Sequence, residues 1–394
     1  MEAMRVPSDE APALSRLDGI DTLRGLSILA VVLLHIWIRL ALDDVRMGRS
    51  WPPTLSHFVW FNGGNGVTVF FAVSGFLITL TSLRRFGSLA AMRPVTFYRI
   101  RFARIMPLLV LLLVVLSAFH LLHVDGFRLN AKHFTLPRAL LAALTFHLNW
   151  LETARDSFLP ACWTVLWSLS IEEAFYLCFP LVCVVLLRWK YGSWLWISVA
   201  LVFVAMGPFA RTVWSTTDLA KENSYLAGMA SIALGCLTAW ITDMLSQRNV
   251  RRGRWLLAIQ TAGWATILLI AIWPTWHHIL RPLGKSGTDD TVLALGTCLV
   301  MLPVALGGAK GHWWSSPVRW FGKHSYEIYL SHEFLVIVGV NMLYDHCFPH
   351  GASWAALAAL VIGIMAMTAP LGWILAKFFA EPMNRRLRGA APAK

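Results

Sequence analysis

Long apolar runs recur from one end of this chain to the other. Each is about 18–25 residues long, which is the length of helix needed to cross the hydrocarbon core of a bilayer. We predict ten such spans: 22–42, 66–83, 105–123, 164–188, 193–210, 226–244, 255–273, 291–308, 324–345 and 353–379. The shorter run 137–151 is predicted to lie at the interface or to re-enter the membrane against protein.

Composition supports a membrane protein, because 57% of the 394 residues are hydrophobic and only 14% are charged. Backbone in lipid must satisfy its own hydrogen bonds, so the predicted fold is all-α. We divide the chain into a cytoplasmic segment (1–21), one transmembrane domain (22–380) and a basic cytoplasmic tail (381–394).

Positive charge is concentrated in alternate loops. The loop after the second span carries Arg84, Arg85 and Arg93 and no acidic residue, whereas the loop after the fifth mixes Lys221 with Asp218. The positive-inside rule then predicts that both termini are cytoplasmic. This pattern accounts for the net charge of +13 without a nucleic-acid partner.

Two ionisable residues share one face of the first span. Arg24 and His35 are eleven positions apart, close to three helical turns or about 16 Å. Arg24 is therefore expected at the inner edge of the bilayer, with Asp21 one turn earlier, and His35 near the middle. Ionisable groups at that depth are costly and usually functional.

Three polar side chains from other spans are expected at about the depth of His35: Glu172, Ser74 and His332. A neutral imidazole can accept a proton from a hydroxyl, and we expect Glu172 to orient His35 and stabilise its imidazolium. Glu173 is a weaker candidate for the same chamber. The alternatives are a hydrogen-bonded core histidine, a paired structural carboxylate, and close helix packing around Ser74.

Arginines in the stretch FYRIRFAR flank the third span. Arg101 and Arg104 are three residues apart and share a helix face, with Arg99 beside them. A guanidinium group donates paired hydrogen bonds to phosphate. We expect these arginines and Arg24 to contact a phosphorylated ligand at the inner mouth; ordinary flanking charge is the alternative.

Five motifs in this order resemble those of the integral-membrane acyltransferase-3 family. IDTLRG, with ten residues between Arg24 and His35, resembles its Arg-x10-His signature, and FFAVSGFL its second-helix motif. FYRIRFAR, WSLSIEEAFY and FGKHSYEIYLSH resemble its Arg-x-x-Arg, Trp-Ser-Leu-x-x-Glu and Ser-Tyr-x-x-Tyr-Leu-x-His motifs. The resemblance extends from residue 20 to the Glu381-Pro382 pair.

The resemblance implies a multi-pass protein of the cytoplasmic (inner) membrane that moves an acyl group, usually acetyl, from acyl-CoA to a hydroxyl. The implied acceptor is a saccharide or lipid-linked glycan, or a small glycoside such as a macrolide. It further implies that His35 is catalytic, that Arg24 assists it, and that Arg101 and Arg104 contact the coenzyme. No metal is implied. Some relatives carry a further C-terminal domain, so a separate periplasmic transferase is one possible partner, and a homo-oligomer is another.

Several alternatives remain at this point. Ser74, backbone amides or Arg24 could stabilise the oxyanion, and a covalent acyl-histidine or acyl-serine could form instead of direct transfer. A transporter or exporter of an envelope component would also place ionisable residues at the midplane. Such a protein would not need a phosphate-binding pair of arginines.

Overall fold

The computed structural model describes residues 17–42, 45, 47, 51–215, 217–248, 253–273, 280–307, 311–344, 347 and 353–389. Every element in these ranges is helical. The predicted N-terminal segment 1–21 is therefore described only from Leu17, and the predicted basic tail only as far as Gly389.

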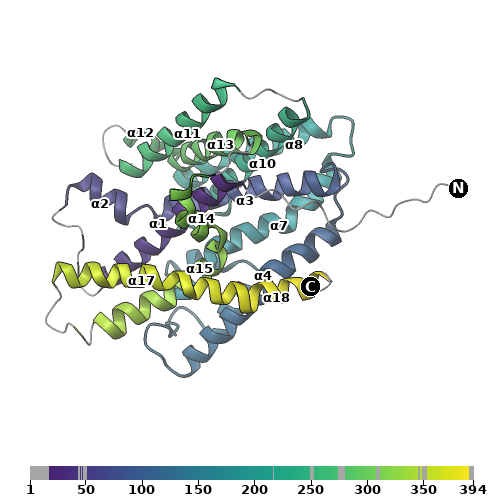
Figure 1. Ribbon diagram of the computed structural model, residues 1–394. Coiled ribbons are helices and arrows are strands. Elements are labelled where there is room, and N and C mark those ends of the chain that lie inside the picture. The colour runs from purple at the N-terminus through teal and green to yellow at the C-terminus, as the bar shows by residue number, and fades with distance from the viewer. Residues whose placement is uncertain are drawn as a thin grey trace.

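Nine of the described helical segments are long and apolar enough to cross a membrane. They are Asp18–Leu42, Gly63–Phe86, Pro94–Leu121, Leu166–Leu186, Gly192–Trp214, Asp218–Gln247, Arg254–Ile272, Asp289–Gly307 and Trp354–Arg388. The prediction of an all-α integral membrane protein is confirmed. Figure 1 shows them as one bundle, with the short α2 (Pro53–Trp60) and the final α18 (Glu381–Arg388) toward opposite ends.

The expected span 324–345 differs from the other nine. It consists of α15 (Ser325–Ile337) followed by a π-helical segment, Val338–Tyr344. Glu327, His332 and Glu333 lie on α15, and all three are buried. Surrounding helices, rather than lipid, cover these polar side chains, which is how ionisable groups are usually accommodated inside membrane proteins.

The remaining helices frame these spans. The run 137–151 forms two short helices, α5 (Leu136–Leu144) and α6 (Leu148–Arg155), neither of which is long enough to cross. The elements that position the site are α1 (Asp18–Leu42), α3 (Gly63–Phe86), α4 (Pro94–Leu121), α7 (Leu166–Leu186), α10 (Tyr225–Gln247), α13 (Asp289–Gly307), α14 (Ser316–Lys323) and α17 (Trp354–Ile374).

Two glycines bring neighbouring helices into close contact beside the site. A Cβ atom on Gly25 would collide with the Val318 carbonyl of α14, and one on Gly75 would collide with the Ile232 carbonyl of α10. Small residues allow helix backbones to approach in this way in membranes. Because Gly25 follows Arg24 and Gly75 follows Ser74, each close contact fixes the backbone next to a candidate site residue.

Candidate active site

His35 is held by its own helix and faces a carboxylate. Its Nδ1 lies 2.8 Å from the Val31 carbonyl, which can only accept, so Nδ1 donates. Its Nε2 lies 3.4 Å from Oε1 of Glu333 on α15. Nε2 is therefore the ring nitrogen available for proton transfer, and Glu333 is placed to stabilise a positive charge on that ring.

His332 lies against His35. The two rings meet edge to face with centroids 4.9 Å apart. His332 is fully buried; its Nδ1 contacts the carbonyls of Ile328 and Tyr329 at 3.1 and 2.9 Å, and its Nε2 has no hydrogen-bond partner among the described residues. The sequence correctly placed His332 near His35.

The ligand atoms of His35, His332 and Glu333 lie within 4.8 Å of one another. Two imidazoles and a carboxylate are a donor set that transition metals accept. A metal bound here would occupy the Nε2 atom that proton transfer needs, so the two uses of His35 exclude each other. The sequence predicted no metal.

Glu172 does not pair with His35 as predicted. The hydroxyl of Tyr176 donates to the Glu172 carboxylate at 3.3 Å, and the same hydroxyl contacts Oγ of Ser74. The Arg101 guanidinium lies over the Tyr176 ring, 4.8 Å from its centroid. Glu172 and Ser74 share a cavity wall with Arg24 and Arg101, whereas His35 lines a different cavity, so they form a separate polar cluster.

Arg24 and Arg104 lie together, about three helical turns along α1 from His35. Arg24 is 4.0 Å from the Asp21 carboxylate, as expected from their spacing. Arg104 forms an ion pair with buried Glu327 at 3.2 Å and lies over the ring of Tyr326. Arg99 is exposed and lines none of the three cavities described next, so the structure does not bring it into this group.

Three cavities are lined by these clusters, and we name them by their position along α1: inner toward Asp18, outer toward Leu42, and middle between the two. The outer cavity, of about 1450 Å³, contains His35 and Glu333 in its wall. The middle cavity, of about 250 Å³, contains Ser74, Glu172 and Tyr176. The inner cavity, of about 290 Å³, contains Asp21 and Glu327.

Shared walls join the cavities in series. The outer and middle cavities share Val67, Phe71 and Tyr329, and the middle and inner cavities share Arg24 and Arg104, together with Leu77. Only three described lining residues are common to each pair of neighbouring cavities. The three cavities are thus neighbours between the Arg24 end of α1 and His35, and arginines line the middle and inner ones.

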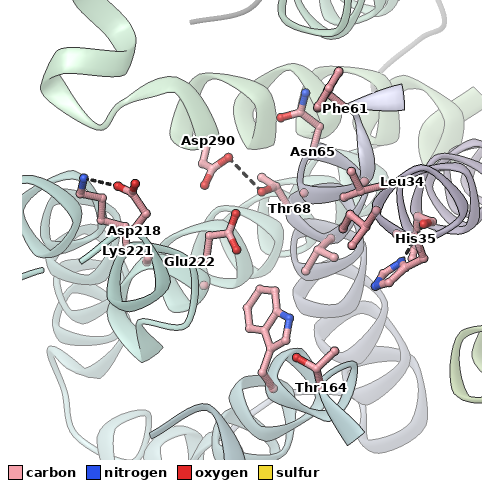
Figure 2. A pocket seen from close by; sticks show the side chains of 18 of the residues that line it. Leu34, His35, Phe61, Asn65, Thr68, Thr164, Asp218, Lys221, Glu222 and Asp290 are labelled. Atoms are coloured by element: carbon pink, nitrogen blue, oxygen red, sulfur yellow. Dashed lines mark hydrogen bonds and ion pairs between the residues drawn. The ribbon is translucent and has the colours of Figure 1, made fainter. Parts of the chain in front are cut away.

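The outer cavity combines aromatic and polar side chains. Figure 2 shows Asn65, Thr68 and Asp290 on one side, with Thr68 donating to Asp290 at 3.0 Å, and Glu222 nearby. Arg211 holds both Asp289 and Asp290 in ion pairs. Trp37, Phe61 and Trp167 also line this cavity. Flat apolar rings among hydrogen-bonding groups are suited to a polar organic ligand.

Glu173 is not part of these cavities. It is 6% exposed, its Oε1 has no hydrogen-bond partner in the described part of the chain, and it lines none of the three cavities. Its neighbour Glu172 faces the middle cavity because adjacent helical residues point about 100° apart.

Sequence reasoning missed four residues of the site: Glu327, Glu333, Tyr176 and Tyr329. Both glutamates were detectable, because they lie on the same predicted span as His332, and Glu333 is its immediate neighbour. The tyrosines gave a weaker signal, since aromatic residues are common in apolar helices. Their hydroxyls make contacts between helices: Tyr176 contacts Ser74, and Tyr329 contacts Ser168.

Glu152 forms hydrogen bonds with three segments of the chain beside the outer cavity. This fully buried residue of α6 accepts hydrogen bonds from the Leu159 amide (2.9 Å), the Thr164 hydroxyl (2.8 Å) and the Asn223 amide (3.0 Å). It lies outside the nine candidate spans, and Thr164 lines the outer cavity. Burial raises the pKa of Glu152 from 4.5 to about 7, against the opposing effect of these three donors.

We expect Glu152 to make folding stability depend on pH. The folded protein holds a proton that the unfolded chain releases above its pKa of 4.5, so stability falls as the pH rises from there through about 7. The loss amounts to about 3 kcal/mol. Thermal unfolding in detergent should show it between about pH 5 and about pH 8, and Glu152→Gln should flatten that profile. An unchanged profile in the variant would contradict this assignment.

The architecture and the site define a class: a polytopic helical membrane protein with an imidazole–carboxylate pair in the wall of a large cavity, next to a smaller polar one. The family model described as "Acyltransferase domain" matches residues 17–377. The chain belongs to this acyltransferase family, which confirms the resemblance drawn from its motifs. No solved structure matches the chain.

Two of the similar proteins are named as O-acetyltransferases. The chain is 26% identical over 337 residues to the peptidoglycan O-acetyltransferase OatA of Listeria monocytogenes, covering 82% of this chain and 50% of that one. It is 24% identical over 342 residues to the O-acetyltransferase OatA of Staphylococcus aureus, covering 83% and 52%. The chain therefore spans about half the length of these relatives.

Proposed function

We propose that this protein is a membrane O-acyltransferase that moves an acyl group, acetyl above all, from cytoplasmic acyl-CoA to a hydroxyl of a saccharide or lipid-linked glycan. Family membership and the O-acetyltransferase names of its relatives support this proposal. The observation that carries it is the position of His35. Its Nε2 lies beside Glu333 in the wall of the outer cavity, and the middle cavity adjoins that wall.

The donor enters from the Arg24 end in this proposal. Arg101 and Arg104 bind the phosphates of the coenzyme, and the pantetheine arm passes through the middle cavity. The helical rise from Arg24 to His35 is about 16 Å, which is on the scale of such an extended arm. Glu172, Tyr176 and Ser74 line this passage, so they position the arm and do not act on the acceptor.

The acceptor occupies the outer cavity. Its hydroxyl gives a proton to Nε2 of His35 as its oxygen attacks the thioester carbonyl carbon. The tetrahedral intermediate collapses with cleavage of the carbon–sulfur bond, and the imidazolium returns its proton to the departing thiolate. Glu333 stabilises the imidazolium in the interval, because its carboxylate lies beside the nitrogen that takes the proton.

The test is a transfer assay with purified protein in nanodiscs, using radiolabelled acetyl-CoA and soluble glycan fragments as acceptor. We expect release of coenzyme thiol that requires the acceptor, together with labelled ester on the glycan. A transporter would instead move glycan across proteoliposome membranes without releasing thiol. No binding of acetyl-CoA and no thiol release would refute the proposed function.

A further inference from the structure

The last described helix brings a further arginine to the inner end of the bundle. Arg388 of α18 lies within electrostatic range of Arg101, Arg85 and Arg104. All four side chains are positively charged, so they repel one another. These four residues are called the arginine cluster below. They come from three separate segments of the chain: α3, α4 and α18.

The fold itself holds Arg388 in this position. Helix α18 continues from α17 through the π-helical segment Leu375–Ala380, within one long helical stretch, Trp354–Arg388. It packs against α4, as Figure 1 shows near the C-terminal end of the chain. The last membrane helix therefore directs α18 onto the helix that carries Arg101 and Arg104.

Arg388 differs from its neighbours on the same helix. It is partly buried, and its Nε is buried with no hydrogen-bond partner among the residues that the structure describes. Arg385 and Arg386 are exposed. A buried donor without a hydrogen-bond partner costs free energy, so the Nε of Arg388 favours a ligand that can accept its hydrogen bond.

The charge balance also favours an anion. Arg104 pairs with Glu327, and Glu172 and Glu173 lie within electrostatic range of Arg101. No ion pair links Arg388 to a carboxylate within the described ranges. Like charges held together repel one another, and phosphate relieves this repulsion while accepting paired hydrogen bonds from guanidinium groups.

We infer that Arg388 is a phosphate-binding residue, and that α18 forms one wall of the site for the phosphate esters of the acyl donor. This inference rests on the proposed function, and it adds a binding residue from a part of the chain that the motifs do not cover. Anionic lipid headgroups offer the same phosphate chemistry, so the experiment must separate the two sources.

The experiment compares Arg388→Ala with Arg386→Ala, which removes the same charge from an exposed position of the same helix. In nanodiscs of zwitterionic lipid, we expect Arg388→Ala to raise KM for acetyl-CoA about tenfold or more at unchanged kcat, and Arg386→Ala to leave KM unaltered. Arg388→Lys should recover part of the loss. With acetyl-pantetheine, which lacks the nucleotide phosphates, all four proteins should have the same KM.

Three results would overturn the inference: equal KM values for the two alanine variants, equal losses with both donors, or a loss confined to nanodiscs that contain anionic lipid. The last would assign the cluster to headgroups. If the unaltered protein released thiol from neither donor, the proposed function itself would fail. Thermal unfolding of Arg388→Ala and Arg388→Lys separates a folding defect from a loss of binding.

Discussion

His35→Ala should lower acetyl transfer by about 10²- to 10⁴-fold, the range that a general base contributes. The variant removes Nε2, which is the ring nitrogen left available when Nδ1 donates to the Val31 carbonyl. It also leaves Glu333 without its imidazole partner. The measurement is acetyl-CoA-dependent labelling of glycan by purified protein at saturating donor.

Two controls keep this first prediction sharp. His133→Ala removes an imidazole from a turn outside the cavities and should retain normal transfer. Binding of acetyl-CoA and the thermal unfolding temperature of His35→Ala should stay close to those of the unaltered protein. Transfer by His35→Ala at the normal rate would remove the imidazole from the mechanism.

Glu333→Gln should also reduce transfer strongly, by about 10²- to 10⁴-fold, because the imidazolium that forms at His35 would lose its charge partner. The effect should lie in kcat, with KM for acetyl-CoA unchanged, since Glu333 lines the outer cavity and not the proposed donor passage. Steady-state kinetics with varied acetyl-CoA measure both quantities.

Glu172→Gln is the matched comparison, because it makes the same change in a carboxylate that lies beside Tyr176. We expect this variant to raise KM for acetyl-CoA and to reduce kcat much less than Glu333→Gln does. The reverse pattern, with kcat abolished in Glu172→Gln and preserved in Glu333→Gln, would restore the pairing first expected from the sequence.

The sequence predicted one neighbour of His35 correctly and another incorrectly. Counting residues along each helix placed His332 at the level of His35, and their rings are in contact. The same count placed Glu172 and Ser74 at that level, yet they contact Tyr176 instead. Which way a side chain points depends on how the helices pack together, and the pattern of residues within one helix does not show this.

Two other differences have the same cause. Arg99 shares a motif with Arg101 and Arg104, but adjacent helical faces diverge and leave it exposed. Arg388 was predicted only as part of a basic tail. Its place in the arginine cluster depends on how α18 and the segment Leu375–Ala380 pack on α4, although α18 and α4 are more than 250 residues apart in the chain.

Gly25 and Gly75 illustrate what sequence patterns do reveal. The alternative interpretation of the Ser74-Gly75 pair was close helix packing, and Gly75 does pack against α10. Ser74 nevertheless lines the middle cavity. The two interpretations were therefore not exclusive: one residue of the pair serves the packing and the other faces the cavity.

The central claim is that the acyl donor reaches His35 from one side of the membrane and the acceptor reaches it from the other. Sealed proteoliposomes of uniform orientation test this most directly, with acetyl-CoA confined to the side of Arg24 and Arg104 and glycan confined to the other. We predict acetylated glycan on the outer side and free coenzyme on the donor side in equal amounts, and neither product with His35→Ala. Transfer only when both substrates share one compartment would contradict the account.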